Sequence, residues 1–210
     1  MALDHSCQVQ RRPHAERGLD LYETPPAAVR ALLRVEQLPH RIWEPAAGRG
    51  AIVNVLRAAG HLVLASDIAD YGDPTHFAGR DFLAETKAPD GCEAIVTNPP
   101  FRIVERFTAH ALDLCPLVIL LLRLAFLESE RRRGILEGRG LARVHVFRKR
   151  LPMMHRDQWA GRKANSGMAF CWMVWDRNHT GPTTVDRISW EETVGPLGAA
   201  PDAIAAEGAP

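Results

Sequence analysis

The tetrapeptide Asn98-Pro99-Pro100-Phe101 directly follows an apolar segment, Glu93 to Thr97, that is typical of a buried strand. Average residue usage would produce this tetrapeptide by chance in about one chain per thousand of this length. The two prolines fix φ and remove two N–H donors, so the loop presents carbonyl acceptors and the Asn98 side chain in a rigid geometry. The Asn98 side-chain oxygen and the Pro99 carbonyl can accept both hydrogens of a planar –NH2 group while Phe101 stacks on the ring.

Such acceptors would activate an aromatic amine. Its nitrogen is a poor nucleophile because the lone pair is delocalised into the ring. Accepting both hydrogens favours a pyramidal nitrogen and localises the lone pair toward an alkyl donor. Alignment for in-line displacement is then sufficient, and no covalent intermediate is required. The tetrapeptide therefore predicts alkylation of a planar amino nitrogen.

A second candidate site is the segment Trp43 to Gly50, a strand that passes through a small-residue loop into a helix. Glu44 at the strand end can accept hydrogen bonds from an ammonium or hydroxyl group. Ala46, Gly48 and Gly50 allow a ligand to approach the backbone closely. A dinucleotide-binding loop is the alternative, but the spacing differs from Gly-x-Gly-x-x-Gly.

Two further acids follow at the ends of predicted strands or turns. Asp67, next to Ile68, ends the strand His61 to Ser66, where an acid commonly binds both hydroxyls of a ribose. Asp81 can bond an adenine amino group while Phe82 packs against the ring. An ordinary turn followed by a buried phenylalanine would explain Asp81 and Phe82 equally well.

The elements that must position these residues alternate between strand and helix, which predicts a doubly wound, mostly parallel α/β sheet. Its ligand would lie beyond the carboxyl ends of the strands, where the strand order reverses. The first helix is expected from Pro25, with Thr24 as N-cap, to about Leu38. The other predicted elements are helices at 51–59, 103–114 and 125–136, strands at 41–44, 61–66, 93–97 and 117–122, and an antiparallel pair, 143–147 and 168–175, at one edge. We expect a loose segment at 1–20, a single domain at 21–194 and a disordered tail at 195–210.

The composition is that of an ordinary globular protein: of the 210 residues, 46% are hydrophobic and 24% are charged. No apolar run approaches the ~18 residues of a membrane span, and Met1 to Gly18 contains no signal-peptide core. The four cysteines are isolated from one another and from histidines at metal-ligand spacing. We therefore expect a cytoplasmic protein without a membrane segment or a metal.

Charge is distributed unevenly. Arg123 to Lys163 contains twelve basic and four acidic residues, although the net charge of the whole chain is only +1. This asymmetry indicates a polyanionic partner, with solvated surface arginines as the alternative. The candidate nucleic-acid-binding residues are Arg131, Arg132, Arg133, Arg148, Lys149, Arg150, Trp159, Arg162 and Lys163.

Taken in order, the motifs resemble the amino-methylating branch of the S-adenosylmethionine-dependent methyltransferases, especially the enzymes that methylate the 6-amino group of DNA adenine. The resemblance covers about Tyr22 to Trp175. It implies a Rossmann-like class I fold, a mostly parallel seven-stranded sheet with an antiparallel edge strand. It also implies S-adenosylmethionine as cofactor and Asn98 to Phe101 as the catalytic tetrapeptide. The implied cofactor-binding residues are Tyr22, Thr24, Pro25, Glu44, Ala46, Gly48, Gly50, Asp67, Ile68, Asp81, Phe82 and Asn98.

Three alternatives stay open at this point. Similar tetrapeptides occur in enzymes that methylate the 2-amino group of guanine in ribosomal RNA, and in enzymes that methylate a glutamine of release factors. The latter typically have tyrosine where this chain has Phe101. A catalytically silent nucleic-acid-binding module of the same fold is the third, although neither Asn98 nor the glycine loop is altered.

One departure concerns the partner. Enzymes of this type usually add a target-recognition domain of about 100 residues or more after the final strand, whereas only a short stretch follows Trp175 here. Loops would then have to read the target. We expect DNA more than RNA as the bound nucleic acid, and a homodimer or a separate recognition subunit stays open.

Overall fold

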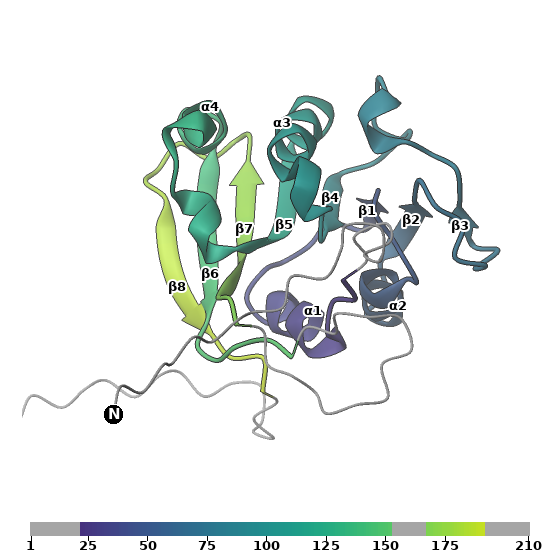
Figure 1. Cartoon of the computed structure of the whole chain (residues 1–210), viewed down its shortest axis with the longest axis horizontal. Helices are drawn as coiled ribbons and strands as arrows, with labels where there is room; N and C mark the ends of the chain where they lie inside the picture. The colour runs from purple at the N-terminus through teal and green to yellow at the C-terminus, as the bar shows by residue number, and fades with distance from the viewer. Residues whose placement is uncertain (1–21, 153–166, 192–210) are drawn as a thin grey trace, which may run out of the picture.

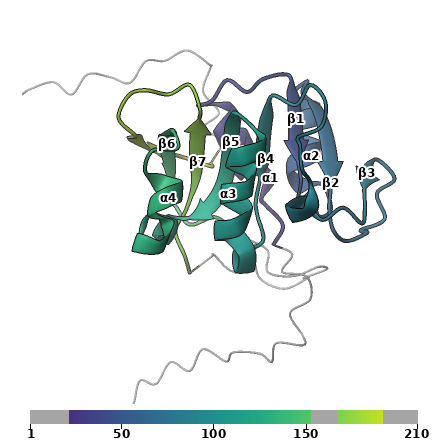
Figure 2. The same cartoon turned by 90° about the horizontal axis from the view of Figure 1, so that it is seen from above.

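The computed structural model describes residues 22–152 and 167–191, which form one sheet with helices on both faces (Figure 1). The strand order is β3-β2-β1-β4-β5-β7-β6-β8, and Figure 2 shows the strands from β3 to β6 side by side. The strands are β1 (Arg41–Glu44), β2 (Leu62–Ser66), β3 (His76–Phe77), β4 (Ala94–Thr97), β5 (Leu117–Arg123), β6 (Leu141–Phe147), β7 (Phe170–Asp176) and β8 (Thr184–Ile188). The predicted doubly wound, mostly parallel α/β fold is confirmed.

Strands β1 to β5 are parallel to one another. From β1 the order runs outward through β2 to β3, and from the neighbouring β4 it runs the opposite way to β5. The order therefore reverses between β1 and β4, where connections leave toward opposite faces and a crevice opens beyond the strand ends. Glu44 ends β1 and Thr97 ends β4, so the residues that follow both strands meet at this crevice.

The sheet has eight strands rather than the seven expected. Strand β7 is antiparallel to both β5 and β6 and lies between them, so the antiparallel strand is inside the sheet and not at its edge. Strand β8, which the sequence did not predict, pairs in parallel with β6 and forms that edge. Its first four residues are exposed, which explains why no apolar alternation indicated a strand.

Helices cover the two faces of the sheet, α1 and α2 on one side and α3 and α4 on the other (Figure 1). They are α1 (Pro26–Leu33), α2 (Ala51–Ala58), α3 (Val104–Leu114) and α4 (Arg133–Leu136), with 3-10 turns η2 (Phe82–Ala84), η3 (Phe101–Ile103), η4 (Leu124–Leu127) and η5 (Glu130–Arg132). Each helix longer than one turn carries a buried apolar stripe, as Ile52, Val53 and Leu56 do on α2. Strand β5 is buried from Val118 to Leu122 because both of its faces are covered.

The start of α1 differs from the prediction. Pro25, not Thr24, is the N-cap residue, and the helix begins at Pro26 and ends at Leu33. Thr24 lies one residue before the N-cap, and its hydroxyl accepts a hydrogen bond from the Asn98 side chain.

The helix predicted at 125–136 is also wrong, since two 3-10 turns and one α-helical turn occupy this segment. Ser129 has φ of 100°, which no α-helix tolerates. The Arg132 guanidinium takes the carbonyls of Ala125, Phe126 and Glu128, which a continuous helix would use for its own N–H groups. Segments 1–20 and 195–210, predicted to be loose, lie outside the described residues.

Candidate active site

A cleft of about 850 Å³, its open mouth included, lies beyond the carboxyl ends of β1, β2 and β4. Sequence-predicted residues that line it are Tyr22, Thr24, Glu44, Ala46, Gly48, Asp67, Ile68, Asp81, Phe82, Asn98, Pro99 and Pro100. Pro25, Gly50 and Phe101 do not line it. The fold thus brings together, in one cleft, segments that lie between Tyr22 and the loop after β4 in the sequence.

Asn98 has a fixed amide orientation. Its Nδ2 donates to the Tyr22 carbonyl and to the Thr24 hydroxyl, both over 3.1 Å. Its Oδ1 is buried and has no partner among the described residues. A buried acceptor without a donor is costly, so the site gains from a ligand that brings an N–H or O–H group to this oxygen.

Glu44 is buried at the floor of the cleft, with 1% of its surface exposed. Its Oε1 accepts a 2.6 Å hydrogen bond from the Thr97 hydroxyl, which joins the ends of β1 and β4. Its Oε2 has no partner in the described part of the chain. Burial raises the pKa of Glu44 well above its usual range, and the Asp67 charge adds to this, while the Thr97 hydrogen bond opposes it. A cation or hydroxyl group on Oε2 would relieve the cost of ionisation.

Asp67 links the loop that contains Gly48 and Gly50 to the end of β2 by hydrogen bonds. Its Oδ2 accepts from the Gly48 backbone N–H over 2.8 Å, and its Oδ1 accepts from the Ala69 N–H over 2.9 Å. Gly48 has φ of 52° and Gly50 has φ of 80°, both in the left-handed region that favours glycine. Gly50 caps α2 with its backbone next to the His76 ring, so its role here is in the turn rather than in the cleft wall.

The predicted adenine-binding pair has a local structural role as well. Asp81 Oδ1 accepts from the Leu83 N–H over 2.9 Å and caps η2. The Phe82 ring is buried, packs edge-on against Trp43 with 5.2 Å between centroids, and lies 4.2 Å from the Phe107 ring. Both residues nevertheless line the cleft.

Phe101 lies beside the cleft rather than in its wall. Its ring centroid is 5.0 Å from that of Tyr22 and 6.0 Å from that of Phe170. The Arg123 guanidinium lies over the same ring, with its carbon 4.3 Å from the centroid. Tyr22, which lines the cleft, is thus an aromatic neighbour of Phe101.

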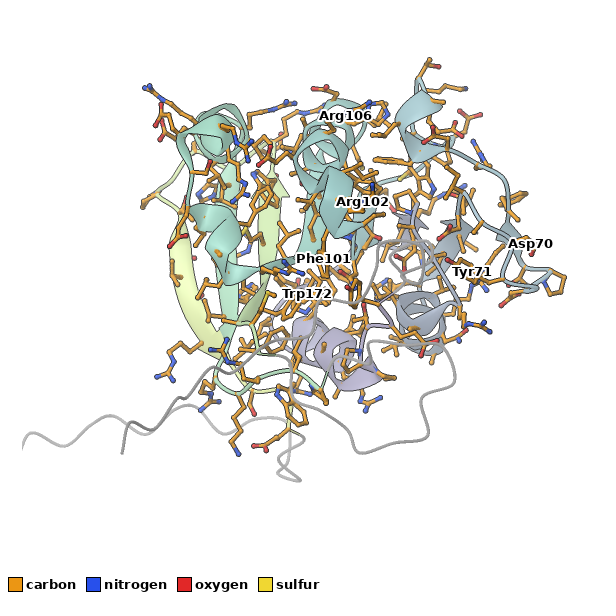
Figure 3. The ribbon with its side chains drawn as sticks, in the orientation of Figure 1. Asp70, Tyr71, Phe101, Arg102, Arg106 and Trp172 are labelled. Carbon is orange, nitrogen blue, oxygen red and sulfur yellow. The ribbon has the colours of Figure 1, made fainter. Side chains whose placement is uncertain are left out.

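Sequence reasoning missed several lining residues. The Arg49 guanidinium carbon lies 5.8 Å from the centroid of the Tyr71 ring, and both residues line the cleft, as do Arg80, Ile103 and Phe107. Tyr71 and Asp70 come from the loop after β2, while Phe101 comes from the loop after β4 (Figure 3). An aromatic residue four positions after the strand-end acid was the available signal for Tyr71.

The predicted nucleic-acid-binding arginines differ in how far they are already engaged. Arg132 donates to Glu105 over 2.9 Å and to three backbone carbonyls, and it stacks on Phe126, which indicates a structural role. Arg131 lies 3.6 Å from Glu105, and Arg133 pairs with Glu130 and Glu137. On the loop after β6, Lys149 pairs with Glu191 over 2.8 Å, while Arg148 and Arg150 are exposed and border a hollow with Trp190. The predictions for Trp159, Arg162 and Lys163 lie outside the described residues.

The fold can be compared with solved structures. A protein from Listeria monocytogenes, assigned as a class I S-adenosylmethionine-dependent methyltransferase, aligns with a TM-score of 0.52 and 11% identity over 76% of this chain and 62% of its own. A protein from Pyrococcus horikoshii, assigned as an RNA methyltransferase, gives 0.56 and 14% identity over 79% of this chain and 90% of its own. The chain has a class I methyltransferase fold.

The same methyltransferase fold occurs in a protein from Vibrio vulnificus assigned as the modification subunit of a type I restriction enzyme, with a TM-score of 0.52, 15% identity and coverage of 80% of this chain and 46% of that one. This chain thus spans less than two thirds of the Listeria and Vibrio proteins. No protein-family model and no curated protein matches the sequence. No helix in residues 22–152 and 167–191 is long and apolar enough to cross a membrane.

Proposed function

We propose that this protein transfers a methyl group from S-adenosylmethionine to the exocyclic amino group of adenine in nucleic acid, with DNA as the favoured polymer. The observation that carries the proposal is the buried, unpartnered Oδ1 of Asn98, held at the cleft by the two hydrogen bonds of its own Nδ2. An amino group is the ligand that this acceptor and the adjacent proline carbonyls suit best.

The cleft residues fit the cofactor. The orphaned Glu44 Oε2 suits its ammonium group, and Asp67, at the end of β2, suits the ribose hydroxyls. Ile68, Tyr71, Asp81 and Phe82 supply apolar surface and one carboxylate for the adenine ring. When bound, the cofactor supplies a methyl group activated by a positively charged sulfur.

The chain's own residues then act by alignment. The Asn98 Oδ1 and the Pro99 carbonyl accept the two amino hydrogens and direct the nitrogen lone pair toward the methyl carbon. The nitrogen–carbon bond forms as the carbon–sulfur bond breaks, and the nitrogen releases one proton to water. Preorganised acceptors of this kind are typically worth about 100- to 1000-fold in rate.

Two observations bear on the acceptor. The first is the class of the neighbours with this fold, among which one is assigned as an RNA methyltransferase and one as a restriction-enzyme modification subunit. The second is the pair of exposed arginines, Arg102 and Arg106, that directly follows Asn98 to Phe101 in the chain and fits a polyanion better than a protein glutamine. The guanine 2-amino group stays the alternative acceptor, because it offers the same two hydrogens to Asn98.

The test is methyl transfer from radiolabelled S-adenosylmethionine to duplex DNA, single-stranded DNA, total RNA and cell protein, followed by nucleoside analysis. Asn98→Ala is the inactive variant, and Asn54→Ala, an exposed asparagine on α2, is the matched control. Label in 6-methyladenine that is lost only in Asn98→Ala supports the proposal. Label in 2-methylguanine or in protein overturns the acceptor, and cofactor binding without any transfer favours a silent module.

A further inference from the structure

Three arginines near the catalytic loop have no hydrogen-bond or ion-pair partner among the described residues. Arg102 and Arg106 are exposed on η3 and the first turns of α3, and Arg123 is half-buried at the end of β5. None of the three donates a side-chain hydrogen bond or lies within 4.0 Å of a carboxylate in residues 22–152 and 167–191. They contrast with Arg131, Arg132 and Arg133, the run that stands out in the sequence, which have acidic partners.

The Arg123 side chain is the least satisfied of the three. Its Nε is buried without an acceptor, and its guanidinium lies over the Phe101 ring. Stacking on an aromatic ring offsets part of the desolvation cost but leaves the N–H donors without hydrogen-bond acceptors. A guanidinium in this state is well suited to two oxygens of a phosphate.

Arg123 lies at the acceptor end of the sheet. Leu120 pairs with Thr97, the residue before Asn98, and Arg123 follows three residues further along the same direction. The Phe101 ring that it covers belongs to the catalytic tetrapeptide. An anion bound by Arg123 would therefore lie beside a base presented to Asn98.

Arg102 and Arg106 extend the positive charge from Arg123 along the start of α3. Arg102 is adjacent in sequence to Phe101, Arg106 lies four residues further on in the first turn of α3, and Figure 3 shows Arg102 between Phe101 and Arg106. Glu105, the acid between them, is engaged by Arg131 and Arg132, at 3.6 Å and 2.9 Å. The two free arginines thus keep their charge available to a ligand.

From this arrangement we propose that Arg123, Arg102 and Arg106 form the phosphate-binding track of the acceptor site, and that nucleic acid crosses the protein along the start of α3. Arg123 binds the phosphate of the nucleotide that is methylated, and Arg102 and Arg106 bind phosphates of its neighbours. The proposal rests on the proposed function, because it takes nucleic acid as the acceptor.

The experiment measures the binding of a fluorescein-labelled single strand of DNA of mixed sequence at several salt concentrations, with an RNA strand in parallel. Each phosphate contact contributes about 0.7 to the slope of log affinity against log salt for a single strand. Arg102→Gln/Arg106→Gln should lower the slope by about 1.4 and the affinity at 0.15 M salt by about tenfold. The matched control, Arg131→Gln/Arg133→Gln, removes the same charge from paired arginines and should change both much less.

Arg123 is tested with two variants. Arg123→Met keeps the apolar contact with Phe101 but removes the charge, and should lower the slope by about 0.7 and raise the KM for the strand. Arg123→Lys keeps the charge and should retain the wild-type slope. Neither variant should change the affinity for S-adenosylmethionine, since Arg123 does not line the cleft.

If the control and the Arg102→Gln/Arg106→Gln variant lost the same amount of affinity and of salt slope, the proposal would be overturned, because diffuse positive charge alone would then explain binding. Unchanged slopes would overturn it while methylation by the wild type still upheld the proposed function. A wild-type protein that binds neither strand yet methylates protein would overturn both. A slope lowered in Arg123→Met and kept at the wild-type value in Arg123→Lys would support the track.

Discussion

The Asn98 side chain donates a hydrogen bond to the Thr24 hydroxyl over 3.1 Å and so joins two segments that are 74 residues apart. A second bond from the same Nδ2 reaches the Tyr22 carbonyl. Because the Tyr22 carbonyl can only accept, turning the amide over would lose that bond and bring two oxygens together. The segment before α1 therefore determines which atom of Asn98 is presented to a substrate.

Thr24→Val should lower kcat by about five- to tenfold, the value of one net hydrogen bond in a buried site. The affinity for S-adenosylmethionine and the Tm should change little, because valine fills the same buried space. Thr24→Ser restores the hydroxyl and should restore kcat. Steady-state kinetics with a labelled cofactor measure this, and a serine variant as slow as the valine variant would contradict it.

Glu44→Gln should remove a pH dependence of the stability of the cofactor-free protein. Burial raises the folded pKa of Glu44 well above the ordinary value of 4.5, so the folded state holds the proton to a higher pH than the unfolded state does. The wild-type free energy of unfolding should therefore fall as the pH rises from about 4.5 to the folded pKa, by up to about 1.4 kcal/mol per pH unit. Urea unfolding of both proteins between pH 5 and pH 8 isolates the difference, and parallel curves would refute the assignment.

The same variant should bind S-adenosylmethionine about 10- to 100-fold more weakly, since a charged hydrogen bond contributes about 1.5–3 kcal/mol. Isothermal titration calorimetry measures the affinity. Glu85→Gln, which alters a carboxylate outside the cleft that pairs with Arg80, is the comparison. Equal weakening in the two variants would argue against a direct role for Glu44.

Gly50→Ala should destabilise the protein by about 1–3 kcal/mol, because an L-residue is strained at φ of 80° and its Cβ would lie 2.9 Å from His76 Cε1. Gly60 has a similar φ of 93° but open space around the Cβ position. Gly60→Ala should therefore cost only the backbone part, about 1 kcal/mol. Thermal unfolding compares the two, and equal losses would show that His76 moves aside freely.

Arg132→Met should lower the free energy of unfolding by about 1–3 kcal/mol, because three carbonyls and Glu105 lose their donor. Arg131→Met, next to it and 78% exposed, should cost less than about 0.5 kcal/mol. Chemical denaturation measures both. A stable Arg132→Met protein with weakened DNA binding would instead restore Arg132 to the nucleic-acid interface.

Local patterns predicted the parts of the fold whose burial is regular. The strand at Arg41–Glu44 has the predicted bounds, and β4 and β5 differ from the prediction by one residue at one end each. Strand β8 was missed because four of its five residues are exposed, and the segment 125–136 was misassigned because Arg132 satisfies its carbonyls from outside the backbone. Apolar periodicity indicates neither an exposed edge strand nor a side chain that binds backbone carbonyls.

The candidate site divides in the same way. Asn98 was identified from its tetrapeptide, and Glu44 and Asp67 from their places at the ends of predicted strands, which meet at the switch point. The position of Phe101 was not predictable, since it depends on packing against Tyr22 and Phe170, which are distant in sequence. Nor was the difference between paired and unpaired arginines, which depends on where Glu105 lies in space.

The place of β7 between β5 and β6 bears on how the chain is made. Arg123 of β5 pairs with Phe170 of β7, 47 residues later, and synthesis of that interval takes about 2 to 10 s. During this time β5 presents an almost entirely apolar strand with one bare edge, the kind of segment that pairs with other chains. A nascent chain stalled before Phe170 should therefore be a target for chaperones, and a fragment ending there should aggregate, because the strand that shields β5 has not yet been made.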